Sequence, residues 1–333
     1  MRSYACVGRQ RPTGRLRCAL RREGYVAESV VTRTPASVAL AAVKQLRPKQ
    51  WTKNAFLFAA LIFSAEFLDP VSVMRACIGF AAFCLLSSTG YVLNDFLDRE
   101  ADRKHPKKRF RPIASGALPI PMAWVLMLVI AVGGSALAIN LSWQFLAIAY
   151  LYLFTTLSYS FYFKHRVILD VMVLSSGFVW RAIAGAIAIG VAVSPWLFLC
   201  TAFLALFLGF NKRRAELLHV GANTGTRRNL QDYSPKMLEQ FQSIVTGSTV
   251  LCYALYTVNN NHTTWMVLTI PWVLYGVFRY IYLVDRHGEG GAPDETLLRD
   301  RPMLITGLGY VLTAMAVLVA SQSGWMPDLI PTN

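Results

Sequence analysis

The sequence has little charge and lacks the usual motifs of zinc and thiol chemistry. Only 15% of its 333 residues are charged, and the five histidines include no H-E-x-x-H motif. None of the six cysteines stands in a C-x-x-C spacing, so we interpret them as small apolar residues. A nucleic-acid partner would need base-stacking aromatic residues on a basic face, whereas the aromatic residues here lie inside apolar segments. We therefore expect no zinc site, no redox thiol and no nucleic-acid partner.

Long apolar segments take the place of charge. Hydrophobic residues make up 55% of the chain, and they fall into blocks of about twenty, the length at which an α-helix crosses a bilayer. This pattern predicts an all-α polytopic membrane protein with about nine transmembrane helices. The predicted spans lie near residues 50–68, 71–97, 119–139, 141–161, 168–190, 194–217, 238–258, 264–284 and 303–323.

The charges of the sequence predict its orientation in the membrane. If the N-terminus is cytoplasmic, Arg75 and Arg181 are the two residues among 33 Lys and Arg that fall outside the inner segments. No hydrophobic core of a signal peptide is visible near the start. We predict a basic, mostly disordered cytoplasmic tail over residues 1–43, a transmembrane domain over residues 44–323 and a short outer tail over residues 324–333.

A group of acidic residues follows the second predicted span. If that helix continues, Asn94, Asp98 and Asp102 lie four residues apart on one face, with Asp95 beside them and Tyr91 one turn earlier. Carboxylates stacked in this way repel one another unless a cation is present, and oxygen ligands suit Mg²⁺ bound together with substrate phosphates. We therefore predict a Mg²⁺ site on Asn94, Asp95 and Asp98. The alternative is a hydrated helix end whose acids face water.

Basic residues gather at the predicted inner ends of several spans. Fixed cations beside a metal site suit a diphosphate, because its charge exceeds what one Mg²⁺ neutralises. The simpler interpretation is a set of positive flanks that determine membrane topology. The candidate substrate-binding residues are Lys49, Lys53, Tyr91, Lys108, Arg111, Tyr159, Lys164, Arg166, Lys212, Arg213 and Glu216.

Arg181 is a basic residue inside a predicted span. It follows Asp170 by eleven positions and so lies on about the same helical face. A buried charge in a membrane must be met by a partner or a polar cavity, and such residues are functional candidates by default. We expect its partner to be Asp170, the acidic group or a bound phosphate; a structural ion pair inside the bundle is the alternative.

The motif N-D-x-x-D-x-x-x-D that begins at Asn94, followed by a basic stretch and R-P-x-x-S-G, resembles the UbiA superfamily of intramembrane prenyltransferases. The resemblance covers about residues 44–323, and it implies a transmembrane transferase domain. It also implies a donor diphosphate that two acidic motifs hold through Mg²⁺. By this resemblance Asn94, Asp95, Asp98 and Asp102 form the first motif.

The second acidic motif is where the sequence departs from that pattern. The loop after the sixth span offers Glu216 and Asp232 among many basic residues. The runs R-P-K-Q-W-x-K-N, Y-S…K-H and S-G-F-x-x-R-A-I-A-G are similar to a narrower branch, the decaprenyl-phosphate phosphoribosyltransferases of actinobacterial cell-wall synthesis. This similarity implies 5-phosphoribosyl 1-diphosphate as donor, a polyprenyl phosphate as acceptor and a product that supplies arabinan synthesis.

The resemblance also implies roles for individual residues. Asp95, Asp98, Asp102 and Arg181 would be the catalytic group. Lys53, Tyr91, Lys108 and Arg111 would hold the donor together with Arg181, and Lys164 and Arg166 the lipid phosphate. The implied location is the plasma membrane, with the site facing the cytoplasm, and the sequence is compatible with a homo-oligomer.

Two other functions compete with this one. The first is a prenyltransferase that moves a prenyl group from its diphosphate to an aromatic or glycerol-phosphate acceptor. The second is a transporter or channel. Transporters place ionisable groups near the membrane midplane, whereas nearly all charge here is expected at one face, with Arg181 as the exception.

Overall fold

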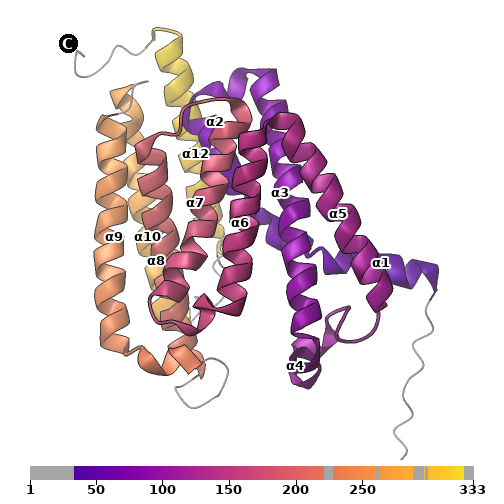
Figure 1. Ribbon diagram of the computed structural model, residues 1–333. Coiled ribbons are helices and arrows are strands. Elements are labelled where there is room, and N and C mark those ends of the chain that lie inside the picture. The colour runs from indigo at the N-terminus through magenta and orange to yellow at the C-terminus, as the bar shows by residue number, and fades with distance from the viewer. Residues whose placement is uncertain (1–33, 221–227, 260–262, 288–295, 297–298, 326–333) are drawn as a thin grey trace, which may run out of the picture.

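The computed structural model describes residues 34–220, 228–259, 263–287, 296 and 299–325, and within them every regular element is a helix. The prediction of an all-α membrane protein is therefore confirmed. Figure 1 shows long helices that run side by side, with the short α4 at the lower end of the bundle.

The first half of the chain contains one long helix on each side of a charged loop. Asp69 caps the first long helix, since its carboxylate accepts the backbone N–H groups of Val71 and Ser72. The elements in order are α1 Pro35–Gln45, η1 Pro48–Leu57, α2 Phe58–Phe63, η2 Glu66–Leu68, α3 Pro70–Leu97, α4 Arg99–Lys104, η3 Lys108–Phe110 and α5 Ile120–Leu141, where η denotes a 3-10 helix.

The second half continues the bundle with longer helices and three further 3-10 turns. Ser142, Ser234 and Asp300 cap the N-termini of α6, α9 and α12 through their side-chain oxygens. The elements are α6 Trp143–Phe161, η4 Phe163–His165, α7 Leu169–Ile189, α8 Pro195–Val220, η5 Arg228–Asp232, α9 Pro235–Val258, η6 Thr264–Thr269, α10 Ile270–His287 and α12 Arg301–Gln322.

Seven helices among the described residues are long and apolar enough to cross a membrane. They match seven of the nine predicted spans: α3, α5, α7, α8, α9, η6 with α10, and α12. The fourth predicted span forms α6, whose 19 residues include Gln, Ser and Thr side chains. The number nine therefore stays a prediction.

The first predicted span, residues 50–68, is broken rather than continuous. Its first part is the ten-residue 3-10 helix η1, and its second part is the six-residue helix α2. Left-handed backbone conformations bound the pair, at Arg47 with φ 53° and at Ala65 with φ 60°. Such values are uncommon outside glycine, and they end regular helix at both positions. The segment carrying Lys49 and Lys53 is thus a separately shaped arm.

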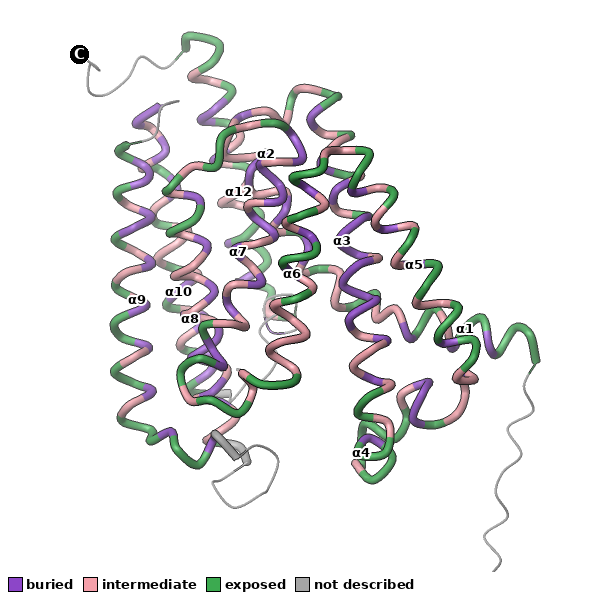
Figure 2. The backbone as a smooth tube through the Cα atoms, viewed as in Figure 1, coloured by how far each residue is buried: buried purple, intermediate pink, exposed green. Residues whose placement is uncertain are grey.

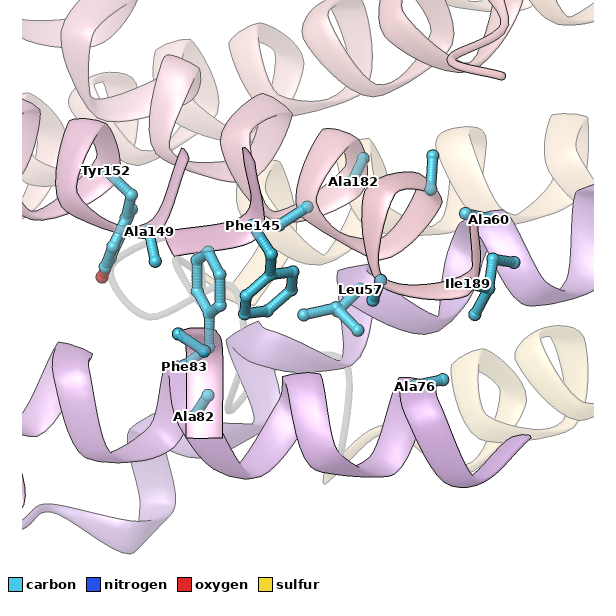
Figure 3. Packing of buried hydrophobic residues seen from close by; sticks show 14 of the residues in the cluster. Leu57, Ala60, Ala76, Ala82, Phe83, Phe145, Ala149, Tyr152, Ala182 and Ile189 are labelled. Carbon is cyan, nitrogen blue, oxygen red and sulfur yellow. The ribbon is translucent and has the colours of Figure 1, made fainter. Parts of the chain in front are cut away.

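Helix α7 is the centre of the first core. In the most apolar stretch of α7, 56% of the residues are buried, against 22% in that of α5. Figure 2 shows the same contrast along the two helices. Figure 3 shows α7 residues packed with Leu57, Phe83 and Phe145 of neighbouring elements. Gly185 permits this packing, because a Cβ built there would stand 2.0 Å from the carbonyl oxygen of Leu57. A glycine therefore lets η1 lie directly on α7.

The N-terminal region differs in part from its prediction. Residues 35–43 belong to helix α1, where disorder was expected up to residue 43. The Thr34 hydroxyl caps this helix by accepting the N–H of Ser37. Val38 and Ala41 pack against Val92 of α3 and other residues of one apolar cluster, so the burial of a short apolar face fixes the helix. The predicted tail from residue 1 to 33 and most of the predicted outer tail lie outside the described residues.

We predict that Gly185→Ala destabilises the protein by about 1–3 kcal/mol, because the new methyl group must push η1 away from α7. Thermal unfolding in detergent micelles measures this as a lower Tm. Gly247→Ala on α9 is the matched control, since an added methyl there meets nothing within 4 Å and alanine favours helix. Equal Tm values for both variants would contradict the packing argument.

Candidate active site

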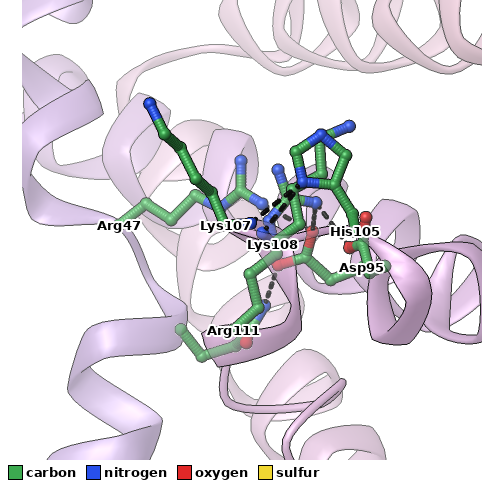
Figure 4. Close-up of polar contacts among 8 residues, drawn as sticks. Arg47, Asp95, His105, Lys107, Lys108 and Arg111 are labelled. Atoms are coloured by element: carbon green, nitrogen blue, oxygen red, sulfur yellow. Dashed lines mark hydrogen bonds and ion pairs between the residues drawn. The ribbon is translucent and has the colours of Figure 1, made fainter. Parts of the chain in front are cut away.

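Asp95 lies at the end of α3 and receives three hydrogen bonds from two other segments of the chain. Its Oδ2 accepts from Gln45 Nε2 at 2.8 Å, and its Oδ1 accepts from Arg47 at 2.5 Å and Arg111 at 2.9 Å. The residue is 2% exposed. Figure 4 shows the two arginines converging on this carboxylate. Hydrogen bonds to ionised groups are the stronger kind, so Asp95 joins α1, α3 and the loop before α5.

Asp102 belongs to the same arrangement. Its Oδ2 accepts from Arg111 at 2.6 Å, so one guanidinium bridges Asp95 and Asp102. The Arg47 guanidinium also lies over the ring of Tyr91, 5.1 Å from its centroid. The structure thus brings together four predicted site residues, Tyr91, Asp95, Asp102 and Arg111, and adds Arg47 and Gln45. We call these six residues the first cluster.

Asn94 and Asp98 have a different environment. Asp98 is exposed and Asn94 half-buried, and neither side chain makes a hydrogen bond within the described part of the chain. The Asp98 backbone N–H donates to the Asn94 carbonyl at 2.9 Å, so the two residues lie on successive turns of one helix end. Within the same residues, no three His, Cys, Asp or Glu side chains gather as a metal site.

The basic stretch after α4 turns beside the first cluster. His105 Nδ1 accepts the backbone N–H groups of Lys107 and Lys108 at 3.2 and 3.3 Å, which tightens the turn (Figure 4). Lys108 is exposed. Arg103 Nε donates to the carbonyl of Ala114 at 3.1 Å and so fastens the stretch back onto itself. The stretch therefore presents its lysines to solvent near the acids.

A second cluster lies at the start of α7. Asp170 is fully buried; its Oδ2 accepts from Arg213 Nε at 2.7 Å and its Oδ1 from the Tyr233 hydroxyl at 2.7 Å. Arg213 also donates to Glu216 Oε2 at 2.6 Å and to the Tyr159 hydroxyl at 3.2 Å. Two predicted residues, Tyr159 and Glu216, thus meet at the guanidinium of a third, Arg213. A buried charge pair with all its donors placed is a rigid feature.

Tyr233 fastens the loop before α7. Its hydroxyl accepts the Ile168 N–H at 2.7 Å, and Ile168 has a φ of 68°, which is rare for a β-branched residue. Burial, together with the hydrogen bond to Asp170, raises the pKa of Tyr233. The phenol therefore stays protonated and continues to donate to Asp170.

Arg181 contacts neither Asp170 nor the acidic group, the two protein partners that we predicted for it. Its side chain is buried, and it donates to Asn54 Oδ1, the Tyr152 hydroxyl and the Gly177 carbonyl, each at 2.8 Å. The guanidinium also lies over the Tyr152 ring, 4.5 Å from its centroid. Neutral groups thus solvate this cation in the span, and through Asn54 it holds η1 against α7.

The other predicted basic residues differ in their exposure. Lys53 is half-buried and donates to Gln50 Oε1 at 2.5 Å, while Arg166 is exposed and donates to the Tyr162 hydroxyl at 3.1 Å. Lys49 is exposed, and Lys164 and Lys212 are half-buried.

An apolar cavity of about 1300 Å³ lies between the η1–α2 arm and the helices of the second half. Helices α8, α9, α10 and α12 contribute most of its wall. Ala55 and Phe56, which directly follow Lys53 and Asn54, also line it, so the cavity begins next to the basic arm. Its aromatic lining includes Phe56, Phe63, Trp196, Tyr253, Trp272 and Tyr310.

Sequence reasoning missed five residues of these networks: Gln45, Arg47, Asn54, Tyr152 and Tyr233. Arg47 and Asn54 belong to the basic run at the first predicted span. The sequence marks that run as a candidate site, but it does not indicate which residues these two would contact. Gln45 and Tyr152 are ordinary residues of amphipathic and apolar helices, and nothing in their spacing distinguishes them.

The fold and the charged end together define a multi-pass helical membrane protein with an acidic and basic site. The model of the UbiA prenyltransferase family matches residues 55–294, and the chain belongs to this family. It is 36% identical over 297 residues to a decaprenyl-phosphate phosphoribosyltransferase of Corynebacterium glutamicum, covering 86% of this chain and 89% of the relative. It is 34% identical over 301 residues to a protein of the same name from Mycobacterium tuberculosis, covering 88% and 99%.

Solved structures agree on the fold. A UbiA homolog from Archaeoglobus fulgidus, bound to GPP and Mg²⁺, superposes with a TM-score of 0.66 at 18% identity, over 84% of this chain and 99% of the homolog. The same homolog bound to Cd²⁺ gives a TM-score of 0.62, with 17% identity, 84% and 99% coverage. Similarity at this level of identity describes the arrangement of helices.

We predict that Arg181→Ala lowers the free energy of unfolding by about 2 kcal/mol or more, because it leaves Asn54 and Tyr152 without their charged partner. Thermal unfolding in micelles measures the change, and Arg166→Ala, at an exposed position, is the control with little effect.

We also expect Arg181→Ala to lose activity while keeping its membrane topology. Lost activity with an unchanged Tm would instead indicate direct contact with substrate.

Proposed function

We propose that this protein transfers 5-phosphoribose from 5-phosphoribosyl 1-diphosphate to a polyprenyl phosphate, which gives polyprenyl-phosphoryl-5-phosphoribose for cell-wall arabinan synthesis. The observation that carries the proposal is the identity of 34–36% to decaprenyl-phosphate phosphoribosyltransferases over nearly the whole transmembrane domain. Both substrates are phosphates, and the protein's charged end contains acids for a metal and bases for anions.

Two residues next to the first cluster in the chain suggest how a divalent metal would be held. Asn94 and Asp98 offer oxygen ligands on successive turns, and their side chains are not engaged by described residues. Mg²⁺ typically binds through one or two carboxylates plus substrate phosphates, so these two residues fit it. When bound, Mg²⁺ would neutralise charge on the donor diphosphate. Asp95 and Asp102 face arginines, so we assign them to positioning rather than to the metal.

The arginines of the first cluster would bind the donor. Arg47 and Arg111 are each partly exposed, at 28%, while the carboxylate they share is buried at 2%. A guanidinium has five donors, so each can keep its bond to Asp95 and still reach a phosphate. Lys53, Tyr91 and Lys108 are further candidates for the phosphates and the ribose. Loss of Asp95 would remove a shared anchor of both arginines, while Asp102 would still bind Arg111.

The reaction itself needs positioning and charge stabilisation more than proton transfer. The C1–O bond to diphosphate breaks, diphosphate leaves with the electron pair, and an oxygen of the lipid phosphate forms the new bond to C1. The acceptor is already an anion at neutral pH, so a general base is not required. Fixed cations around the departing diphosphate favour the charge distribution of the transition state.

The acceptor would enter from the bilayer. Its phosphate would lie at headgroup level near Lys164 and Arg166, and its apolar tail would occupy the cavity that opens beside η1. Arg213, Glu216, Tyr159 and Lys212 would line the approach from the second cluster. We assign the protein to the plasma membrane, with the end that contains the two clusters facing the cytoplasm. The proposal is compatible with a homo-oligomer.

We predict that membranes containing this protein label polyprenyl phosphate from radioactive 5-phosphoribosyl 1-diphosphate and not from labelled prenyl diphosphate. Thin-layer separation of the lipid products measures the transfer. Membranes that carry Asp98→Ala serve as the control for background enzymes. Product formed from the prenyl donor alone would favour the prenyltransferase alternative.

We predict that Asp98→Ala reduces transfer at least a thousandfold while Tm stays near that of the parent, because an exposed ligand contributes little to folding. Glu100→Ala is the matched control: its carboxylate is exposed two positions away, and it should retain activity. EDTA should abolish transfer by the parent and Mg²⁺ should restore it. Full activity of Asp98→Ala, or after chelation, would exclude the metal role.

A further inference from the structure

Helix α1 is apolar on two opposite sides. Val38, Ala41 and Gln45 point inward and are buried, and Val38 and Ala41 pack on the cluster around Val92 and Ile113. On the opposite side, Leu40 is 70% and Val43 is 55% exposed. A surface helix with one solvent-facing side normally carries polar residues there. The outer side of α1 is therefore suited to a medium other than water.

The length and position of α1 exclude a transmembrane helix. Eleven residues extend about 16 Å, roughly half of the hydrocarbon thickness. The inward side packs on Leu118, just before α5, and on Ala123 in its first turn. Figure 1 shows α1 lying across the lower part of α5 rather than along it. The helix thus lies where the α4 end of the bundle meets the membrane surface.

Helix α5, which shares one apolar cluster with α1, also exposes apolar residues. Val125, Leu128 and Val129 of α5 are each 62–63% exposed in a transmembrane helix, so they face acyl chains. Trp124 is 42% exposed near the start of the same helix, where tryptophan commonly marks the membrane interface. Near its start, helix α5 thus exposes apolar residues, as α1 does on its outer side.

We propose that α1 is an interfacial helix that lies in the leaflet at the α4 end, with Leu40 and Val43 among the acyl chains. Ser37 and Lys44 lie on the remaining, polar side and face headgroups and water, and Lys44 is placed to meet lipid phosphates. Helices of this kind insert their apolar face to a depth of about 5–10 Å. The partner is the bilayer itself.

This placement connects the bilayer to the first cluster. Gln45 is the last residue of α1 and donates to Asp95, the Leu46 carbonyl accepts the hydroxyl of Ser88 on α3, and Arg47 follows directly. Lipids that fix the position of α1 at the membrane surface thus also fix Gln45 and Arg47, which donate to Asp95. The membrane location of α1 does not depend on the reaction proposed above.

Site-directed spin labelling tests the location. A ketone-bearing amino acid at position 40 or 43, coupled to a nitroxide, avoids the native cysteines, and position 37 is the matched control on the polar side. Full-length protein in phospholipid nanodiscs is then measured by power saturation with oxygen, which partitions into lipid, and with a nickel chelate, which stays in water. We expect labels at 40 and 43 to favour oxygen and the label at 37 to favour nickel.

Two results would overturn the proposal. Nickel accessibility at positions 40 and 43 equal to that at 37 would mean that the outer side of α1 faces water. Low accessibility to both reagents would mean that protein, such as a second copy of the chain, covers it. Because Leu40 and Val43 are exposed, labels there should leave folding intact, and agreement between the two positions guards against a local artefact. A failure here would leave the transfer reaction untouched, since the readout contains no substrate.

Discussion

Asp95 is a buried carboxylate, and the way its charge is met determines much of the structure around it. The donors are Gln45 at the end of α1, the left-handed residue Arg47, and Arg111, which follows Asp95 by sixteen positions. An unpaired buried charge is far more costly than a paired one, so these segments must assemble together. The arm η1 begins directly after Arg47, and Arg181 holds it further along through Asn54. The arm is thus fixed between a carboxylate at one end and a guanidinium further along.

The two clusters use opposite arrangements of the same charges. In the first, one aspartate receives two arginines that remain partly exposed, so the cations keep donors for a further anion. In the second, one arginine, 1% exposed, is shared by two carboxylates and a tyrosine, so its donors are occupied within the protein. The first arrangement is open to a ligand and the second braces helices α6, α7 and α8.

Local pattern predicted the features that depend on neighbouring residues. Apolar blocks gave the helices, because spanning length follows from hydropathy, and four-residue spacing placed Asp98 and Asp102 on successive turns. The pairing of Arg213 with Glu216 is likewise a helical neighbour contact. The missed features depend on tertiary packing: Arg181 meets Asn54 across 127 positions, and Asp95 meets Arg47 across 48. Nor does composition distinguish a 3-10 arm from an α-helical span.

The 3-10 form of η1 has a geometric consequence for the charged end. A 3-10 helix rises about 2.0 Å per residue and an α-helix about 1.5 Å, so the ten residues of η1 extend roughly 5 Å further than an α-helix would. Three residues per turn also bring Gln50 and Lys53 into one row, where their side chains bond. Rewinding the arm would shorten it and break that row. The pitch of this one segment therefore sets how far Lys49 and Lys53 lie from Arg47 along the arm.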